Sequence, residues 1–324
     1  MFLNNIKDIA RKIIPYDLQC AMKRPEISRS VPPLVFNDSG ELCHWAYLQA
    51  KGSNHHPYML CDGPMPHRVI WDRFNYALNT HFYCEEDIFH TRPYGTHHLA
   101  RLAEAEVIIP NVWKDIRLQK EYIEKEFDFF FTHSADLLET FSNAKFCPAG
   151  AVWYGSRQWG GNLEESVVKT KNVSIVSSNK VSCPLHVFRL ELAKRLLSYQ
   201  GVDVFGTVVG RYAKPVEIFK DYRYSIAIEN EISPYWFTEK ITNCFASKTV
   251  PIYIGASKIG DFFNEDGMII IKEPTIEAVE KALKQCSQED YNSRKEAIDD
   301  NFNRVKGFLC PEDYLYNHYP KIFE

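Results

Sequence analysis

Short apolar runs alternate with helical stretches between residues 173 and 271, and this alternation restricts the fold more than any other feature of the sequence. The apolar runs end in polar turns, and the stretches between them space their apolar residues as a helix does. The predicted strands are 173–177, 202–206, 225–229, 250–255 and 268–271, and the predicted helices are 187–199, 238–247 and 257–263. Strands separated by helices predict an α/β fold with a parallel, doubly wound sheet.

The first half of the chain predicts a second α/β unit with a less regular pattern. The expected elements are a buried strand at 107–110, a helix at 118–127, a strand at 128–132 and a helix whose N-cap is Ser134. A glycine- and serine-rich stretch at 154–171 has no apolar periodicity and predicts a linker. The expected division is an N-terminal domain at 1–160, a C-terminal domain at 171–305 and a tail at 306–324 that packs back on the N-terminal domain.

Charge and cysteine content argue against several classes of protein. With 38 basic and 42 acidic residues the net charge is −4, which argues against a polybasic nucleic-acid binder. No run of about 18 apolar residues is present, so no membrane-spanning helix is expected. The nine cysteines are widely spaced and form no C-x-x-C motif, which predicts buried thiols in a reducing cytoplasm rather than disulfides or a zinc site.

The N-terminal segment 2–14 places apolar residues at helical spacing beside Lys7, Arg11 and Lys12, and Pro15 ends the pattern. Such a helix would either lie flat on the anionic inner face of a membrane or dock on the protein's own core. Amphipathicity alone does not separate these two interpretations. Peripheral membrane contact through residues 2–14 therefore stays open.

Polar residues follow two of the predicted strands, at the edge where an open parallel sheet binds its ligands. Glu229-Asn230 ends one strand, and Thr238-Glu239-Lys240 begins the next helix, whose free N–H groups favour anions. Ser178 and Lys180 follow the first strand, and Arg189 on the next helix can clamp a diphosphate bidentately. Taken singly, each is more often a turn or surface residue, but together they suit a nucleotide diphosphate sugar.

The segment from Ile228 to Gly255 resembles the signature of the α-1,3-fucosyltransferases, glycosyltransferase family 10. It reads Glu229-Asn230, a variable loop, Phe237-Thr238-Glu239-Lys240-Ile241 and then Thr249-Val-Pro-Ile-Tyr-Ile-Gly255. Residues 174–206 resemble the bacterial form of the family, and residues 66–75 and 103–110 resemble bacterial and phage members. The resemblance implies a GT-B architecture, in which two Rossmann-like domains face each other across a cleft, with the acceptor on the N-terminal domain and the donor on the C-terminal one.

The resemblance also implies a role for each matched residue. Arg189 and Lys240 would neutralise the GDP diphosphate, Asn230 and Glu239 would bind hydroxyl groups of the donor, and Glu104 would be the general base. Further donor contacts are expected from Glu229, Trp236, Tyr235, Ser178 and Lys180. Two positions depart from the family pattern: Trp236 replaces the usual Tyr, and Ala105 replaces the Ser that follows the base, so both hydroxyl groups are missing.

The expected reaction is inverting transfer of L-fucose from GDP-fucose to a hydroxyl of a glycan or lipid-linked saccharide. Glu106 is the alternative base, and a carboxylate without catalytic role is the other interpretation of either residue. No Asp-x-Asp motif occurs, so no metal or other cofactor is expected, and Glu85-Glu86-Asp87 is interpreted as a solvated turn. His55-His56 and His97-His98 lack metal-ligand spacing. A different nucleotide sugar, or a non-catalytic glycan-binding relative, are the alternative functions.

Overall fold

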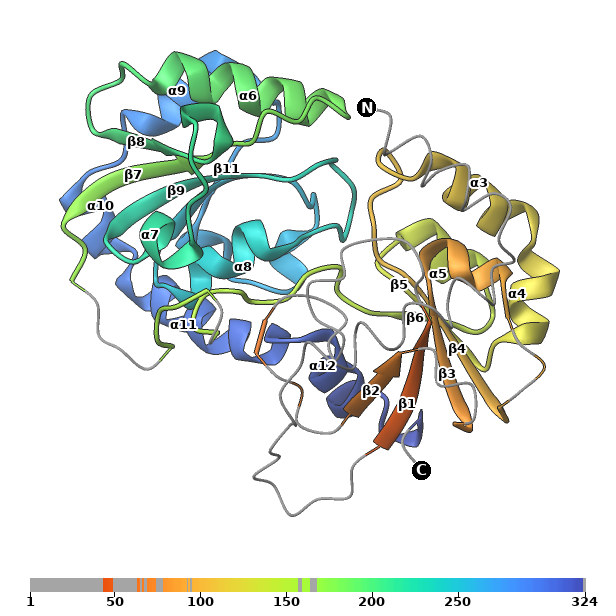
Figure 1. Ribbon diagram of the computed structural model, residues 1–324. Coiled ribbons are helices and arrows are strands. Elements are labelled where there is room, and N and C mark those ends of the chain that lie inside the picture. Colours follow the sequence, from red (N-terminus) through yellow and green to blue (C-terminus); the bar gives the residue numbers. More distant parts are fainter. Residues whose placement is uncertain are drawn as a thin grey trace.

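A computed structural model gives the fold, in which two parallel β-sheets occupy the two halves of the chain (Figure 1). The structure describes residues 43–48, 63–64, 66, 69–73, 78–91, 93, 95–156, 159–163 and 168–322. The predicted helix at 2–14 lies outside these residues. We call residues 43–146 the N-terminal lobe and residues 168–305 the C-terminal lobe.

The N-terminal lobe is built on a parallel sheet with strand order β2-β1-β3-β4-β5-β6. Its strands are β1 (Cys43–Leu48), β2 (Val69–Arg73), β3 (Thr80–Cys84), β4 (His97–Leu102), β5 (Phe129–Thr132) and β6 (Ala144–Phe146). Its helices are the 3-10 helix η1 (Glu85–Phe89) and the α-helices α3 (Pro110–Leu118), α4 (Lys120–Glu126) and α5 (Ala135–Thr140). Ser134 is the N-cap of α5, as predicted, because its side chain accepts a hydrogen bond from Leu137 N.

The predicted strand at 107–110 is wrong. Strand β4 ends at Leu102, and residues 106–108 form a turn in which the N–H groups of Ile108 and Ile109 both donate to Ala105 O. Pro110 then occupies the first turn of α3, where its missing N–H costs nothing. The apolar run resembles a short strand in sequence because the residues of this tight turn are half-buried.

The C-terminal lobe has the predicted parallel, doubly wound sheet, with strand order β11-β10-β9-β7-β8. Its strands are β7 (Lys171–Val176), β8 (Val202–Phe205), β9 (Tyr222–Ile228), β10 (Val250–Ile254) and β11 (Ile269–Ile270). Its α-helices are α6 (Pro184–Leu196), α7 (Pro215–Phe219), α8 (Glu239–Ala246), α9 (Ile276–Leu283), α10 (Gln288–Ser293) and α11 (Lys295–Val305). The 3-10 helices are η2 (Thr207–Val209), η3 (Ile259–Asp261) and η4 (Glu265–Gly267), so only a 3-10 turn occupies the helix predicted at 257–263.

Helices cover both faces of this C-terminal sheet (Figure 1). On one face α6 and α9 pack against apolar residues of the strands, including Ile175 and Ile226. On the other face α7 and α8 pack in a cluster that includes Ala227 and Tyr253. Because strands β9 and β10 are buried on both faces, they are nearly continuous apolar runs in sequence.

The order in which strands are added to this sheet reverses at β7, because β8 lies on one side of β7 and β9 on the other. The carboxyl ends of β7 and β9 therefore form a topological switch point, the place where open α/β sheets bind ligands. The residues that follow these two ends are Ser177-Ser178 and Glu229-Asn230.

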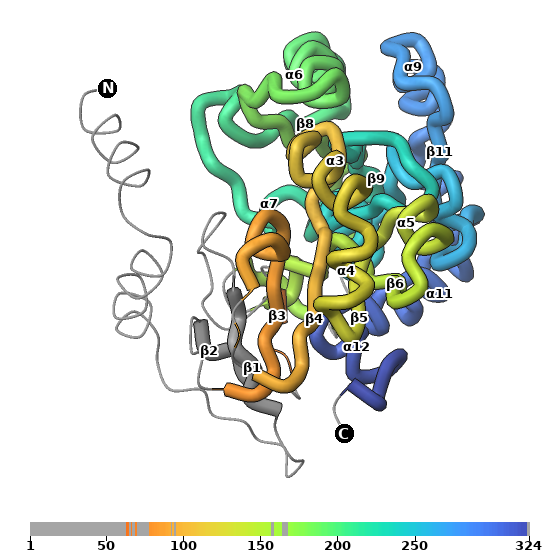
Figure 2. Tube along the Cα trace, turned by 90° about the vertical axis from the view of Figure 1, so that its right-hand side faces the viewer, coloured from red at the N-terminus to blue at the C-terminus, as the bar shows by residue number. Residues whose placement is uncertain are grey.

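The C-terminal segment returns to the N-terminal lobe (Figure 2). After the 3-10 helix η5 (Lys306–Phe308), helix α12 (Pro311–His318) places Leu315 in a cluster with Phe82 and Phe131, and the 3-10 helix η6 (Pro320–Ile322) follows. The hydroxyl of Tyr319 donates to Phe146 O at 2.8 Å. The two lobes are therefore joined by the tail as well as by the crossover between the sheets.

Two class predictions can be compared with the structure. None of the helices in the described ranges is long and apolar enough to cross a membrane. The six cysteines described with their side chains, Cys84, Cys147, Cys183, Cys244, Cys286 and Cys310, are all buried. The prediction of buried thiols is confirmed for these six.

Candidate functional site

The start of helix α8 is held by a buried carboxylate. Glu229, directly after β9, is 0% exposed and accepts hydrogen bonds from Thr238 N at 2.8 Å and Thr238 Oγ1 at 2.7 Å. Lys240 Nζ lies 2.9 Å from Thr238 Oγ1 and 3.3 Å from a carboxylate oxygen of both Glu229 and Glu239. A cation is thus fixed at a helix N-terminus, where the free N–H groups also attract anions.

The charges of this cluster depend on one another. Burial raises the pKa of Glu229, and the neighbouring Lys240 ammonium acts against that rise. Burial also disfavours the charged form of Lys240, but the carboxylates of Glu239 and Glu229 outweigh it and raise the pKa of Lys240. Lys240 is therefore a permanent cation, and its 20% exposed side chain retains access to a ligand.

Helix α6 brings two more polar groups to the same sheet edge. Arg189 Nη1 donates to Ile228 O at 2.8 Å, which fixes the guanidinium beside the end of β9. His186 Nε2 lies 2.9 Å from Asn230 Oδ1, and burial lowers the pKa of His186, so the neutral ring donates Nε2–H to that oxygen. The amide NH₂ of Asn230 is thereby oriented away from His186 and left available to a ligand oxygen. His186 is a positioning residue that the predicted site did not include.

A pocket of ≈ 220 Å³ opens beside these groups. Of the predicted site residues, Ser178, Arg189, Glu239 and Lys240 line it. The other lining residues come from β7, β9, the segment around α7, helix α8 and the crossover: Trp153, Val176, Tyr212, Ala213, Pro215, Ile218, Phe219, Ser225, Ile226, Ala227, Ile228 and Asn243. Most of the lining residues are apolar, and the charged ones are Arg189, Glu239 and Lys240, which suits a ligand with an aromatic end and an anionic end.

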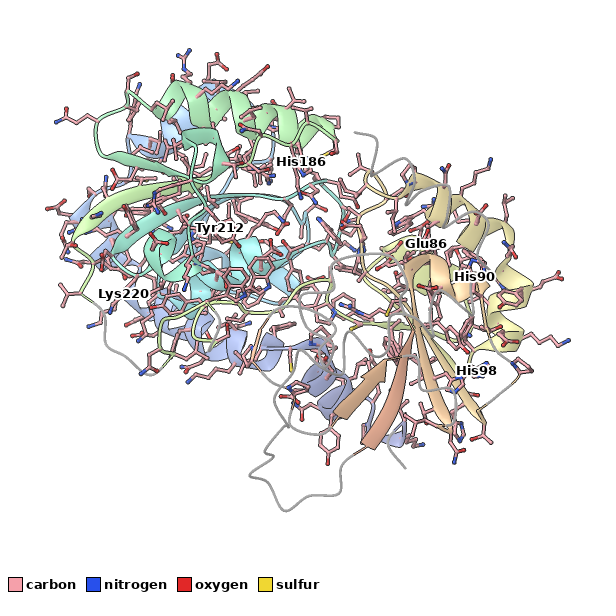
Figure 3. The ribbon with its side chains drawn as sticks, viewed as in Figure 1. Glu86, His90, His98, His186, Tyr212 and Lys220 are labelled. Atoms are coloured by element: carbon pink, nitrogen blue, oxygen red, sulfur yellow. The ribbon has the colours of Figure 1, made fainter. Side chains whose placement is uncertain are left out.

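The remaining predicted donor residues lie around this pocket rather than in it. Lys180 is exposed in the turn after β7, where its N–H donates to Ser178 Oγ at 3.3 Å. Figure 3 shows His186 at the start of α6, on the side of the C-terminal lobe that faces the N-terminal lobe. Tyr212, which the sequence reasoning missed, is labelled in the same lobe near α7.

Trp236 and Tyr235 pack between elements instead of lining the pocket. Trp236 is 3% exposed, and its ring lies 4.6 Å from that of His133, which follows β5 in the other lobe. Burial lowers the pKa of His133 to about 3, so this contact is between neutral rings. Tyr235 packs edge-on against Phe146 and Phe262. The pair therefore joins the lobes.

Glu104 follows β4, and its carboxylate is within electrostatic reach of charged residues of the C-terminal lobe. Its Oε1 accepts a hydrogen bond from Ala105 N at 2.9 Å. Burial raises the pKa of Glu104, while Lys240 and Lys180 lower it and Glu239 raises it further. All three of these charged partners belong to the other lobe, so Glu104 and the cluster at the start of α8 act on each other across the space between the lobes.

Glu106, the alternative base, has a different environment. Arg117 donates to both of its carboxylate oxygens, at 2.6 and 2.7 Å, and also contacts Asp136. This bidentate pair is exposed. Both carboxylate oxygens of Glu106 are therefore occupied by Arg117.

The acidic run after β3 is not the solvated turn that was predicted. It forms the first turn of η1, in which Asp87 is 1% exposed. Glu85 turns its carboxylate inward, and Oε1 accepts hydrogen bonds from the N–H groups of Ala103 and Glu104. Charged residues usually lie at the surface, so the sequence predicts a solvated turn. The backbone N–H groups that make burial of a carboxylate possible leave no pattern in the sequence.

The crossover between the sheets is docked on helix α8. Asn243 Oδ1 accepts from both Trp153 N and Tyr154 N at 2.8 Å, and Thr242 Oγ1 donates to Ala151 O at 2.8 Å. A Cβ added to Gly150 would lie 2.6 Å from Thr238 Cα, so only glycine fits against this helix start. The described part of the connection is therefore a fixed joint.

No group of three or more His, Cys, Asp or Glu side chains within the described ranges is arranged to hold a metal ion. In the predicted His97-His98 pair, His97 lies 3.1 Å from Asp128 and His98 lies 2.9 Å from Glu126. Each histidine thus has its own carboxylate partner. The pair His55-His56 lies outside the described residues.

Two parallel α/β sheets, one in each lobe, are the architecture of the GT-B fold. Solved structures of this class are similar in fold. The crystal structure of TarM has a TM-score of 0.51 at 11% identity, over 76% of this chain and 54% of that chain. Sucrose-phosphate synthase from Thermosynechococcus elongatus has a TM-score of 0.50 at 9% identity, over 77% of this chain and 74% of that chain.

The sequence of the C-terminal lobe matches a known family domain. Residues 167–295 match the model of the glycosyltransferase family 10 (fucosyltransferase) C-terminal domain, and the protein is a glycosyltransferase with this family 10 domain. An α1,3-fucosyltransferase crystallised with GDP is similar over 91% of this chain and 97% of that chain, at 14% identity and a TM-score of 0.49.

Proposed function

We propose that the protein is an inverting fucosyltransferase that moves L-fucose from GDP-fucose to a hydroxyl group of a glycan or lipid-linked saccharide. The observation that carries the proposal is the placement of Glu104 after β4, in a segment whose Val107 N–H donates to Glu231 of the C-terminal lobe at 3.2 Å and within electrostatic reach of Lys240 and Glu239. It pairs a proton acceptor on one lobe with a diphosphate-binding cluster on the other. The family 10 domain of residues 167–295 supports fucose as the sugar.

The donor would bind with its nucleotide in the pocket and its diphosphate at the start of α8. The pocket of ≈ 220 Å³ is smaller than the roughly 300–1,000 Å³ of a site that encloses a whole ligand, so it would hold the nucleoside end only. Arg189 and Lys240 would neutralise the diphosphate, and Asn230 and Glu239 would bind hydroxyl groups. Ser178 and Lys180 flank the same end of the site. These groups would be held in place by three residues that do not line the pocket: Glu229, Trp236 and Tyr235.

Glu104 would act as the general base. It takes the proton of the acceptor hydroxyl while the hydroxyl oxygen forms a bond to the anomeric carbon of fucose. The bond from that carbon to the diphosphate oxygen breaks on the opposite face, and its electron pair leaves with GDP, which inverts the configuration. Burial supports this role because it raises the pKa of Glu104 and strengthens it as a proton acceptor.

The proposal needs no metal ion, because fixed protein cations would stabilise the departing diphosphate. Arg189, Lys240 and the N-terminus of α8 converge on one place. Positively charged groups that are already in position lower the barrier where negative charge develops. Full activity after treatment with EDTA is the expected result, and a requirement for added Mg²⁺ or Mn²⁺ would contradict it.

A donor screen tests the function. The protein is incubated with GDP-fucose, other GDP-sugars and UDP-sugars, together with a panel of glycan acceptors, and products are detected by mass. Transfer of fucose from GDP-fucose supports the proposal. Transfer of another sugar would replace the donor, and binding of glycans without any product would indicate a non-catalytic relative. Thermal shifts with GDP, UDP and CDP rank the nucleotides independently, because ligand binding stabilises the folded state.

The cellular location belongs to the same proposal. Buried thiols in the described part of the chain support a reducing compartment such as the cytoplasm. Contact of residues 2–14 with the inner face of a membrane stays a prediction. Binding of the full chain to anionic vesicles, compared with neutral ones, tests it.

A further inference from the structure

Glu85 adopts a backbone conformation that is unusual for its residue type. It follows β3 directly and has a φ of 57°, in the left-handed region that non-glycine residues rarely adopt. Only Lys248 shares this property among the non-glycine residues of the described chain. Such a conformation costs on the order of 1 kcal/mol and persists where the surrounding structure holds it in place.

The side chain of Glu85 shows what holds it. Oε1 accepts hydrogen bonds from two successive backbone N–H groups, that of Ala103 at 3.0 Å and that of Glu104 at 3.2 Å. Strands β3 and β4 are parallel neighbours with Cys84 opposite Arg101, so the next residues on each strand emerge side by side. The left-handed turn at Glu85 directs its carboxylate across this strand end.

The carboxylate that makes these two contacts is buried. Oε2 is buried and makes no hydrogen bond within the described residues, and burial raises the pKa of Glu85 to about 7. A buried oxygen without a partner is unfavourable, so the site carries both backbone strain and desolvation. Strain of this kind concentrates at functional sites.

Glu104 is held from its other side as well. The indole N–H of Trp113 donates to Glu104 O at 3.0 Å, and Glu104 Oε1 accepts from Ala105 N. With its N–H bound by Glu85, the backbone of Glu104 is thus fixed at both of its polar groups. The carboxylate of Glu104 therefore has little freedom to move.

The geometry points to Glu85 as a positioning residue for the transfer reaction, which sets the place of the Glu104 carboxylate by holding the N–H groups of Ala103 and Glu104. The inference rests on the proposed function of Glu104. A misplacement of a catalytic group by about 1 Å can reduce the rate about 10²-fold, so a residue that touches no substrate can control turnover.

Two substitutions separate the hydrogen bonds of Glu85 from its charge. Glu85→Gln keeps a carbonyl oxygen at the same reach but removes the charge, whereas Glu85→Asp keeps the charge but is one carbon–carbon bond too short. Aspartate tolerates the left-handed region, so the Asp variant retains the turn. We expect Glu85→Gln to keep kcat near the wild-type value and Glu85→Asp to lower it about 10–100-fold.

Binding of the donor should not change in either variant. The Kd for GDP and the KM for GDP-fucose are expected to stay unchanged in both variants, because Glu85 belongs to the other lobe. Glu139→Gln and Glu139→Asp, at an exposed carboxylate on α5, are the matched controls and should leave kcat unchanged. Loss of kcat in Glu85→Gln to the level of Glu85→Asp would overturn the inference, as would an unchanged kcat in Glu85→Asp.

Hydrogen exchange of the amides of Ala103 and Glu104 provides a readout that does not depend on transfer. These amides should stay protected in Glu85→Gln and exchange faster in Glu85→Asp, and equal exchange in the two variants would overturn the inference. If the wild-type chain transferred no fucose to any acceptor, the proposed function would fail. The exchange result would still decide whether Glu85 holds this backbone segment.

Discussion

In both lobes a glutamate that follows a strand holds backbone N–H groups at or beside a predicted site residue, but the two glutamates differ in their partners. In the C-terminal lobe Glu229 accepts from Thr238 N and Oγ1 and also lies 3.3 Å from the Lys240 ammonium. In the N-terminal lobe Glu85 accepts from two backbone N–H groups, and Oε2 has no hydrogen-bond partner within the described residues.

The difference separates two kinds of work. Under the proposed function, the C-terminal lobe gathers fixed charges, which would bind an anion whether or not an acceptor is present. The N-terminal lobe would fix the place of a single carboxylate, which would matter only during proton transfer. Substitutions in the C-terminal lobe should therefore weaken binding of GDP, whereas substitutions near Glu104 should lower turnover and leave that binding intact.

The largest effect is expected from Glu104→Gln. Loss of the proton acceptor should lower kcat about 10²–10⁴-fold, because general-base catalysis contributes a factor of that size. The Kd for GDP, measured by calorimetry, should change little. Glu106→Gln is the control, since Glu106 is already paired with Arg117. A normal rate in Glu104→Gln together with a low rate in Glu106→Gln would transfer the role of base to Glu106.

Lys240→Met should produce the second largest effect and alter binding. Without its ammonium the Kd for GDP should rise about 10–100-fold, the value of hydrogen bonds to a charged group. Removing one partner of a buried ion pair also destabilises by about 3–5 kcal/mol, because Glu229 keeps an unpaired buried charge. Lys120→Met, in a partly exposed pair with Glu124, should cost less than about 1 kcal/mol.

The stability loss in Lys240→Met should depend on pH. Burial already raises the pKa of Glu229 in the folded state, and removal of Lys240 raises it further. An acid with a raised folded pKa is stabilising at low pH, and that contribution is lost as pH rises through the folded pKa. Urea unfolding should therefore give a smaller loss at pH 5 than at pH 8. Equal losses at both values would mean that Glu229 is not the destabilising charge.

The sequence predicted the candidate donor-binding residues of the C-terminal lobe more completely than the residues that hold Glu104 in the N-terminal lobe. Arg189, Asn230 and Lys240 follow strand ends of a regular β–α pattern, so their meeting at one sheet edge follows from the parallel topology alone. The role of Glu85 depends on a left-handed turn and on backbone N–H groups of another strand. Contacts from side chain to remote backbone leave no pattern of residue types, and the same holds for the docking of Asn243 on the crossover.

Gly150→Ala tests the crossover that joins the two lobes and packs against the start of helix α8. The added Cβ would lie 2.6 Å from Thr238 Cα and 2.7 Å from Glu239 N, so the start of α8 must shift. We expect a stability loss of about 1–3 kcal/mol, as for other overpacked sites, and a weaker affinity for GDP. Gly307→Ala is the control, because nothing lies within 4 Å of its added Cβ. Unchanged GDP affinity in Gly150→Ala would show that the crossover does not set the place of Thr238.

The smallest effect is expected from Glu231→Ala, which removes a direct contact between the lobes. Glu231 Oε2, in the loop after β9, accepts a hydrogen bond from Val107 N at 3.2 Å. Loss of one such bond, about 0.5–1.5 kcal/mol, should lower kcat about 2–10-fold by loosening the approach of the Glu104 segment to the donor lobe. Glu231→Gln keeps an acceptor oxygen and should stay near the wild-type kcat. If Glu231→Ala instead weakened GDP binding at constant kcat, this loop would belong to the donor site, and the division of work between the lobes would be less sharp.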